Sequence, residues 1–139
     1  MSVQAILLPL FVQVLLTFAL LLWMASLRGS AIRQGFDLRT IALGEPNWPP
    51  RATQVANAFR NQFEVPVLFY VLTVLALYLR KADIVFVVLA WVFVISRLLH
   101  AYIHVTSYAV QRRGLAYIVG VLVLLIMWII FIARILLAL

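Results

Sequence analysis

A run in the first half of the chain, residues 51–70, combines amides, a base and an acid with a largely apolar ending. Asn57, Asn61 and Glu64 are spaced i, i+4 and i+7, so on a helix they share one face. Arg60 lies four residues before Glu64 and borders that face. Such groups are costly inside a membrane, and four of them exceed what packing between helices requires. The pattern favours a binding or catalytic site, with polar contacts between helices as the alternative.

A second polar group interrupts a later apolar stretch. Arg97, His100 and His104 are spaced i, i+3 and i+7 and share one helix face. Two histidines at i and i+4 can bind a metal, but no carboxylate accompanies them, so we expect no metal site. Arg113 and Tyr117 follow at the start of the next apolar run. Because arginine suits carboxylates through its planar fork of donors, the expected ligand is a small anion with several carboxylates.

The composition is that of a membrane protein. Of 139 residues, 67% are hydrophobic and 11% are charged, with a mean hydropathy of +1.15; soluble domains are nearer half apolar and a quarter charged. The net charge of +7 arises from basic residues that flank the apolar runs, which indicates membrane topology and not nucleic-acid binding. The chain has no cysteine, so disulfides, thiolate nucleophiles and Cys-based metal sites are excluded. Any thiol must arrive with a ligand.

The apolar runs predict an all-α integral membrane protein, a single domain with a bundle of four transmembrane helices. The expected helices span residues of about 5–27, 50–79, 84–108 and 115–137. Pro66 lies inside the second helix and predicts a kink just after Glu64, because proline removes one backbone hydrogen bond. A turn is expected over residues 111–114, which contain two arginines and a glycine.

The basic residues predict the orientation of the bundle. The first loop, the start of the helix after it and the third loop carry Arg28, Arg33, Arg39, Arg51, Arg112 and Arg113, against Arg80, Lys81 and Arg134 on the other side. Six against three favours cytoplasmic first and third loops, with both termini on the opposite side. Arg112 and Arg113 have an alternative interpretation as nothing more than a topological anchor.

The depths of the polar residues along their helices link the two groups. Glu64 lies ~20 Å along the second helix from Arg51, and Arg97 lies ~17 Å from the expected end of the third helix. Similar depth predicts a structural ion pair between Glu64 and Arg97, within one subunit or across an interface. The sum is a cationic, amide-rich pocket in the cytoplasmic half of the bundle. If it opens sideways to lipid, an anionic cosubstrate can meet a lipophilic one.

In this combination the chain resembles the MAPEG family, the membrane-associated proteins in eicosanoid and glutathione metabolism. The pattern that carries the resemblance is Arg60-Asn61-x-x-Glu64 followed by Pro66 and Phe69, then Arg97-x-x-His100, then Arg113-x-x-x-Tyr117. The length and the four-helix layout agree, so the resemblance covers nearly the whole chain, and it is to bacterial-type members of the family.

The resemblance implies a homotrimer in a bacterial inner membrane, with glutathione bound as cosubstrate between neighbouring subunits on the cytoplasmic side. Carried over to this sequence, the glutathione-binding residues would be Arg28, Arg60, Asn61, Glu64, His100, His104, Arg113 and Tyr117. Arg113 would be the catalytic residue, because a nearby cation lowers the pKa of a thiol and the thiolate is the nucleophile. The implied activity is that of a glutathione-dependent transferase or peroxidase acting on a lipophilic electrophile.

Four positions depart from the family pattern. His104 stands where a tyrosine is usual in the prostaglandin and leukotriene synthases, Gly114 replaces a serine, Asn57 replaces an arginine, and Pro66 is closer to Glu64. These departures motivate a second hypothesis, a non-catalytic member of the fold that binds a lipid or a partner protein. A third, a small multidrug-type exporter, shares four helices and an intramembrane glutamate, but those exporters usually carry the glutamate in the first helix.

Overall fold

The computed structural model of the chain describes residues 2–42, 48–106 and 110–138, and these ranges contain helices and no strand. The elements are α1 (Val3–Arg33), η1 (Leu38–Ile41), α2 (Pro50–Arg60), η2 (Asn61–Phe63), α3 (Val65–Tyr78), α4 (Ile84–Thr106) and α5 (Val110–Leu136). They form four spans long and apolar enough to cross a bilayer, because α2, η2 and α3 together make the second. The predicted all-α, four-helix transmembrane fold is therefore confirmed.

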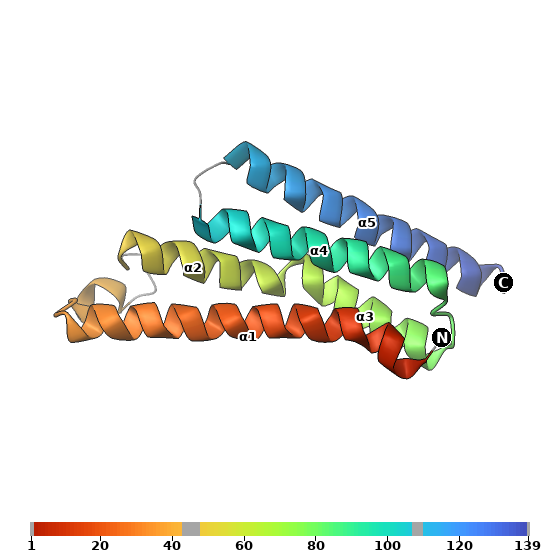
Figure 1. Cartoon of the computed structure of the whole chain (residues 1–139), viewed down its shortest axis with the longest axis horizontal. Helices are drawn as coiled ribbons and strands as arrows, with labels where there is room; N and C mark the ends of the chain where they lie inside the picture. Colours follow the sequence, from red (N-terminus) through yellow and green to blue (C-terminus); the bar gives the residue numbers. More distant parts are fainter. Residues whose placement is uncertain (1, 43–47, 107–109, 139) are drawn as a thin grey trace.

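The four spans run side by side along the long axis of the molecule (Figure 1). α1 packs along α2 and α3, and α4 lies against α1 and α2. α5 packs chiefly against α4 and diverges from it toward its own first turns, which Figure 1 shows clearly. The two termini lie at one end of the bundle, and η1 lies at the other. An even number of spans produces this arrangement.

α1 continues to Arg33, beyond the predicted end near residue 27. Gly29 lies inside the helix and does not end it. Gly35 lies two residues after the last helical residue, and its φ of 90° is in the left-handed region that glycine adopts readily. The N–H groups of Gly35 and Phe36 donate to the carbonyl oxygens of Ile32 and Ala31 over 3.1 and 3.0 Å, which is a Schellman cap. The polar residues after position 27 therefore extend the helix.

The second span is interrupted earlier than predicted. The α-helical part ends at Arg60, and η2 occupies Asn61–Phe63 before α3 begins at Val65. Glu64 joins the two parts with φ −95° and ψ −107°, outside the helical region. Pro66 explains the restart, because it has no N–H to continue a helical ladder through this point.

α5 begins at Val110, so the predicted turn at residues 111–114 is helical instead. Gly114 lowers helix stability by roughly 1 kcal/mol relative to alanine but does not end the helix. The predicted end of the third helix at residue 108 lies outside the described residues.

Two apolar clusters are separated by a polar layer. One cluster gathers around Phe69, Leu72, Phe93 and Met127, where α3, α4 and α5 meet. The other joins α1, α2 and α4 and contains Leu20, Val55, Ala58, Ala101 and Val105. Between them along the chain lie the buried polar side chains of Gln13, Gln62, Arg97 and His100. The candidate site is in this layer.

Candidate functional site

Arg97 is the centre of the polar layer and is only 1% exposed. One of its terminal nitrogens, Nη2, donates to the carbonyl oxygen of Asn61 over 3.3 Å. Its guanidinium carbon lies 5.7 Å from the centroid of the Tyr117 ring, in cation–π range. Its Nε is buried and has no hydrogen-bond partner. A buried cation thus has a backbone carbonyl and an aromatic ring as neighbours.

Glu64 does not form the predicted ion pair with Arg97 within the chain. Two ion pairs of the described residues join Asp37 to Arg39 and Asp83 to Arg134, and neither contains Glu64 or Arg97. Glu64 is exposed on the second span. The helix break explains this, because it places the Asn61 carbonyl at the guanidinium. A pair between subunits stays a prediction.

The two histidines continue the layer toward the end of α4. The His100 ring centroid lies 5.6 Å from that of Tyr117 and 5.7 Å from that of His104. The side-chain nitrogen of Asn61 lies 3.4 Å from Nδ1 of His104. Arg113 is half-buried in the first turns of α5, one helical turn before Tyr117. We call Asn61, Arg97, His100, His104 and Tyr117 the polar cluster, with Arg113 at its edge.

Other predicted site residues lie outside this cluster. Arg60 and Glu64 are exposed on the second span. Arg28 is half-buried near the end of α1, where its guanidinium carbon lies 5.0 Å from the centroid of the Trp48 ring. The single chain therefore brings together Asn61, His100, His104 and Tyr117, places Arg113 one helical turn before Tyr117, and leaves the other three predicted residues apart.

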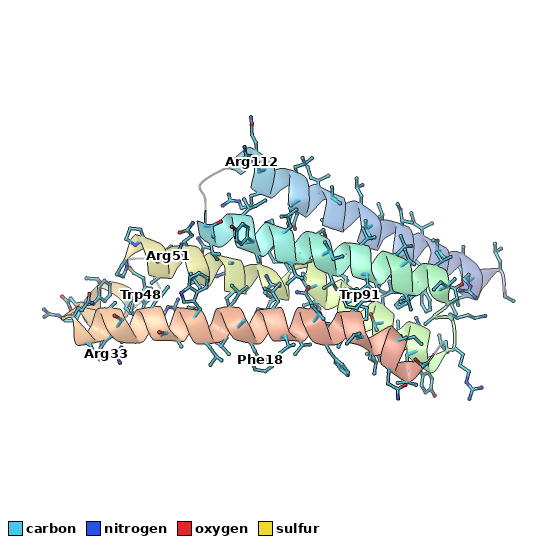
Figure 2. The ribbon with its side chains drawn as sticks, viewed as in Figure 1. Phe18, Arg33, Trp48, Arg51, Trp91 and Arg112 are labelled. Atoms are coloured by element: carbon cyan, nitrogen blue, oxygen red, sulfur yellow. The ribbon has the colours of Figure 1, made fainter. Side chains whose placement is uncertain are left out.

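Arg51 and Gln54 hold the end of α4, a role that the sequence analysis did not assign. Gln54 Nε2 donates to the carbonyl oxygen of His104 over 2.8 Å, and Arg51 donates to the carbonyl oxygen of Val105. Arg51 also covers the Trp23 ring at 4.8 Å, and Figure 2 labels it near the end of the bundle opposite the termini. The last turn of a helix has carbonyl groups without helical donors, so these contacts fix the turn that carries His104.

Gln62 and Gln13 form the second set of contacts that the sequence analysis missed. Gln13 Nε2 donates to Gln62 Oε1 over 2.6 Å, linking α1 to η2. Gln62 lies between Asn61 and Glu64 in the motif but is not among the predicted site residues. The amide of Gln13 in the apolar first span could have indicated this contact, because a buried amide needs a hydrogen-bond partner at its own depth in the membrane.

An apolar groove of about 420 Å³ lies between α3 and α5. Val65, Leu68, Val121, Leu124, Leu125 and Trp128 line it. Val65 directly follows Glu64, and Val121 lies one helical turn after Tyr117, so the groove begins next to the polar layer. Its volume is in the range of ligand pockets.

Comparison with known families finds a match to the model of the MAPEG family over residues 6–133, nearly the whole chain. No curated protein and no solved structure matches the chain.

Proposed function

The chain belongs to the MAPEG family, and from this premise we propose that it is a glutathione-dependent transferase or peroxidase. Glutathione is the cosubstrate, and its thiol is activated for attack on a lipophilic electrophile. The chain has no cysteine of its own, so the thiol is supplied entirely by the bound tripeptide.

The observation that carries the proposal is the buried Arg97 guanidinium. A buried charge is stable only when it is paired or hydrogen-bonded. No carboxylate of the described residues is in ion-pair contact with Arg97, and its Nε has no partner. His100 Nδ1, one turn away, is also buried without a partner. A ligand with carboxylates would satisfy both groups, and glutathione has two.

Arg113 is the proposed catalytic residue. It is half-buried near the start of α5, one helical turn before Tyr117 of the polar cluster. A cation at this place lowers the pKa of a nearby thiol by favouring the thiolate, which is the nucleophile. Positioning the glutathione thiolate next to the electrophile supplies the remainder of the rate enhancement.

The exposed Arg60 and Glu64 support an interface with a neighbouring subunit, and the resemblance to the MAPEG family implies that the assembly is a homotrimer with glutathione between subunits. Both residues are in a membrane span, where a charge facing lipid is unfavourable. A neighbouring subunit would cover them, and Arg28 would approach the ligand from the same interface. In this assembly the predicted residues Arg60, Asn61, Glu64, His100, His104, Arg113, Tyr117 and Arg28 bind glutathione, and Arg97 joins them as the partner of a ligand carboxylate. We place the trimer in a bacterial inner membrane with the first and third loops cytoplasmic.

A second candidate is a non-catalytic member of the family that binds a lipid. The apolar groove between α3 and α5 favours this candidate. Its lining residues carry no charge, and the indole N–H of Trp128 is their one polar side-chain group. The same groove would hold the electrophile in the catalytic proposal. The two candidates therefore differ in whether the protein ionises the thiol of bound glutathione.

The test is glutathione binding to detergent-purified protein, with the thiolate followed by its ultraviolet absorbance. We expect binding with a thiolate signal, and loss of that signal in Arg113→Ala. Arg112→Ala is the matched control, since it removes the neighbouring, exposed arginine. Binding without a thiolate signal would favour the non-catalytic candidate. Absence of binding would refute the glutathione proposal.

A further inference from the structure

Two buried glutamines connect the first span to the break in the second. Gln13 is 0% exposed and Gln62 is 1% exposed, and 49 residues separate them. Their side-chain amides are joined by the 2.6 Å hydrogen bond from Gln13 Nε2 to Gln62 Oε1. In the described part of the chain, buried hydroxyls of the apolar spans do not link different spans in this way. Thr73 and Ser96, for example, bond to carbonyl oxygens of their own helices.

Gln62 also contacts the helix end that precedes it. Its Nε2 donates to the carbonyl oxygen of Ala58 over 2.9 Å. This carbonyl belongs to the last turn of α2, where the helical ladder runs out of regular donors. Gln62 therefore bonds α1 through its amide oxygen and α2 through its amide nitrogen. The side chain holds the end of α2 at a defined place against α1.

The residue before Gln62 makes the contacts that define the site. The Asn61 carbonyl oxygen accepts from Arg97, and the Asn61 amide lies 3.4 Å from the His104 ring nitrogen. Both contacts depend on where the short 3₁₀ segment begins. A one-residue shift of this segment would turn Asn61 by about 100° around the helix axis and away from α4.

We propose that Gln13 and Gln62 are positioning residues for the glutathione site. Their hydrogen bond holds the break of the second span in register, so that Asn61 presents its carbonyl to Arg97 and its amide to His104. Neither glutamine touches the ligand. This inference rests on the proposed function for its ligand, but the effect on Arg97 and His104 exists without ligand.

The test uses the double variant Gln13→Leu/Gln62→Leu. Replacing both partners by apolar groups of similar size leaves neither amide unpaired, so stability is little changed. We expect the midpoint of thermal unfolding to stay within about 4 °C of the wild type. Glutathione affinity should fall roughly tenfold, the effect of one lost hydrogen bond of ordinary strength. The pH midpoint for forming the bound thiolate should rise as well.

Thr73→Val is the matched control, because it also removes a fully buried polar group from the second span. Its hydroxyl bonds only within α3, to Phe69. We expect unchanged glutathione affinity and an unchanged pH midpoint. If the glutamines serve packing alone, the double variant will behave like this control, and the proposal is overturned.

A ligand-free measurement separates this inference from the proposed function. The chain contains only two histidines, so nitrogen-15 labelling of histidine in untagged protein reports on His100 and His104 alone. The His104 ring signals should move in the double variant and stay in place in Thr73→Val. If wild-type protein binds no glutathione but His104 responds in this way, the proposed function fails and the positioning role stands. Static histidine signals would overturn the positioning role.

A milder variant covers the case in which the double variant does not fold. Gln13→Asn keeps an amide but is one methylene shorter, so it withdraws from Gln62. It should produce the same displacement of the His104 signals in a folded protein. An unchanged spectrum for this variant would contradict the inference.

Discussion

The two ends of the bundle are held together by different forces. From the polar layer toward the end with η1, directed polar contacts join the helices beside the smaller apolar cluster, from Gln13 to Gln62, from Arg97 to Asn61 and from Gln54 to His104. At the end with the termini, aromatic and aliphatic side chains pack without direction, and Phe69 and Phe93 lie 4.8 Å apart between ring centroids. Arg134 and Asp83 add one ion pair at the surface of that end.

The difference has a physical consequence for substitutions. Dispersion contacts depend on volume, so an apolar region tolerates replacements that fill the same space. A buried hydrogen bond depends on both partners, and removing one leaves the other unsatisfied. We therefore expect the terminal end to control stability and the polar end to control ligand binding. Three substitutions test this separation, from the largest expected effect to the smallest.

Phe93→Ala should have the largest effect, and on stability alone. Phe93 is fully buried in the apolar cluster between α3 and α4. Loss of a buried phenyl ring costs about 3–5 kcal/mol of unfolding free energy, through lost contacts and a cavity. Denaturant unfolding in detergent measures it. The glutathione affinity of the protein that remains folded should stay unchanged. A large loss of affinity without a loss of unfolding free energy would contradict the separation between stability and ligand binding.

Arg97→Met should have the opposite effects, with stability retained and glutathione binding weakened. Methionine fills much of the same volume and removes an incompletely paired buried charge, so the unfolding free energy should stay equal or increase. Glutathione binding should weaken by about 2–3 kcal/mol, the value of hydrogen bonds to a charged group. Calorimetric titration measures the affinity. Normal binding by this variant would remove Arg97 from the site and the central argument for an anionic ligand.

Gly120→Ala should have the smallest effect and lies at the border of the two regions. A Cβ at this position would come within 2.7 Å of Ser96 Oγ, because α4 and α5 approach closely here. The clash costs about 1–3 kcal/mol, and the gain in helix propensity of roughly 1 kcal/mol offsets part of it. The double variant Ser96→Ala/Gly120→Ala removes the clash, so thermal unfolding should return to the wild-type value or above it.

A Gly120→Ala variant that also weakens glutathione binding would sharpen the comparison. Arg97 follows Ser96 directly, and its Cδ lies 3.8 Å from the position of the added carbon. A displacement of α5 by the added methyl group would then move the Arg97 side chain and so weaken glutathione binding. Unchanged affinity would place the boundary between the two regions at this glycine.

Much of this molecule follows from local features of the sequence. Four apolar runs predict four membrane helices, since length and hydropathy suffice to identify a span. The spacing of Arg97, His100 and His104 predicts that they share one face of a helix, and all three are buried on α4, because helical periodicity decides which residues share a face. The same motifs identify the family, which the match over residues 6–133 establishes.

The tertiary structure decides which polar groups become partners. Depth arithmetic places Arg97 at the correct level, but its partner within the chain is the Asn61 carbonyl and not the Glu64 side chain. Depth along a helix is a property of one segment, whereas a hydrogen bond also depends on how two helices rotate and where one of them breaks. The break at Asn61–Phe63 changes the rotation of every residue that follows it. Gln62 therefore gains its role only in the folded bundle, where Gln13 of a distant segment lies 2.6 Å away.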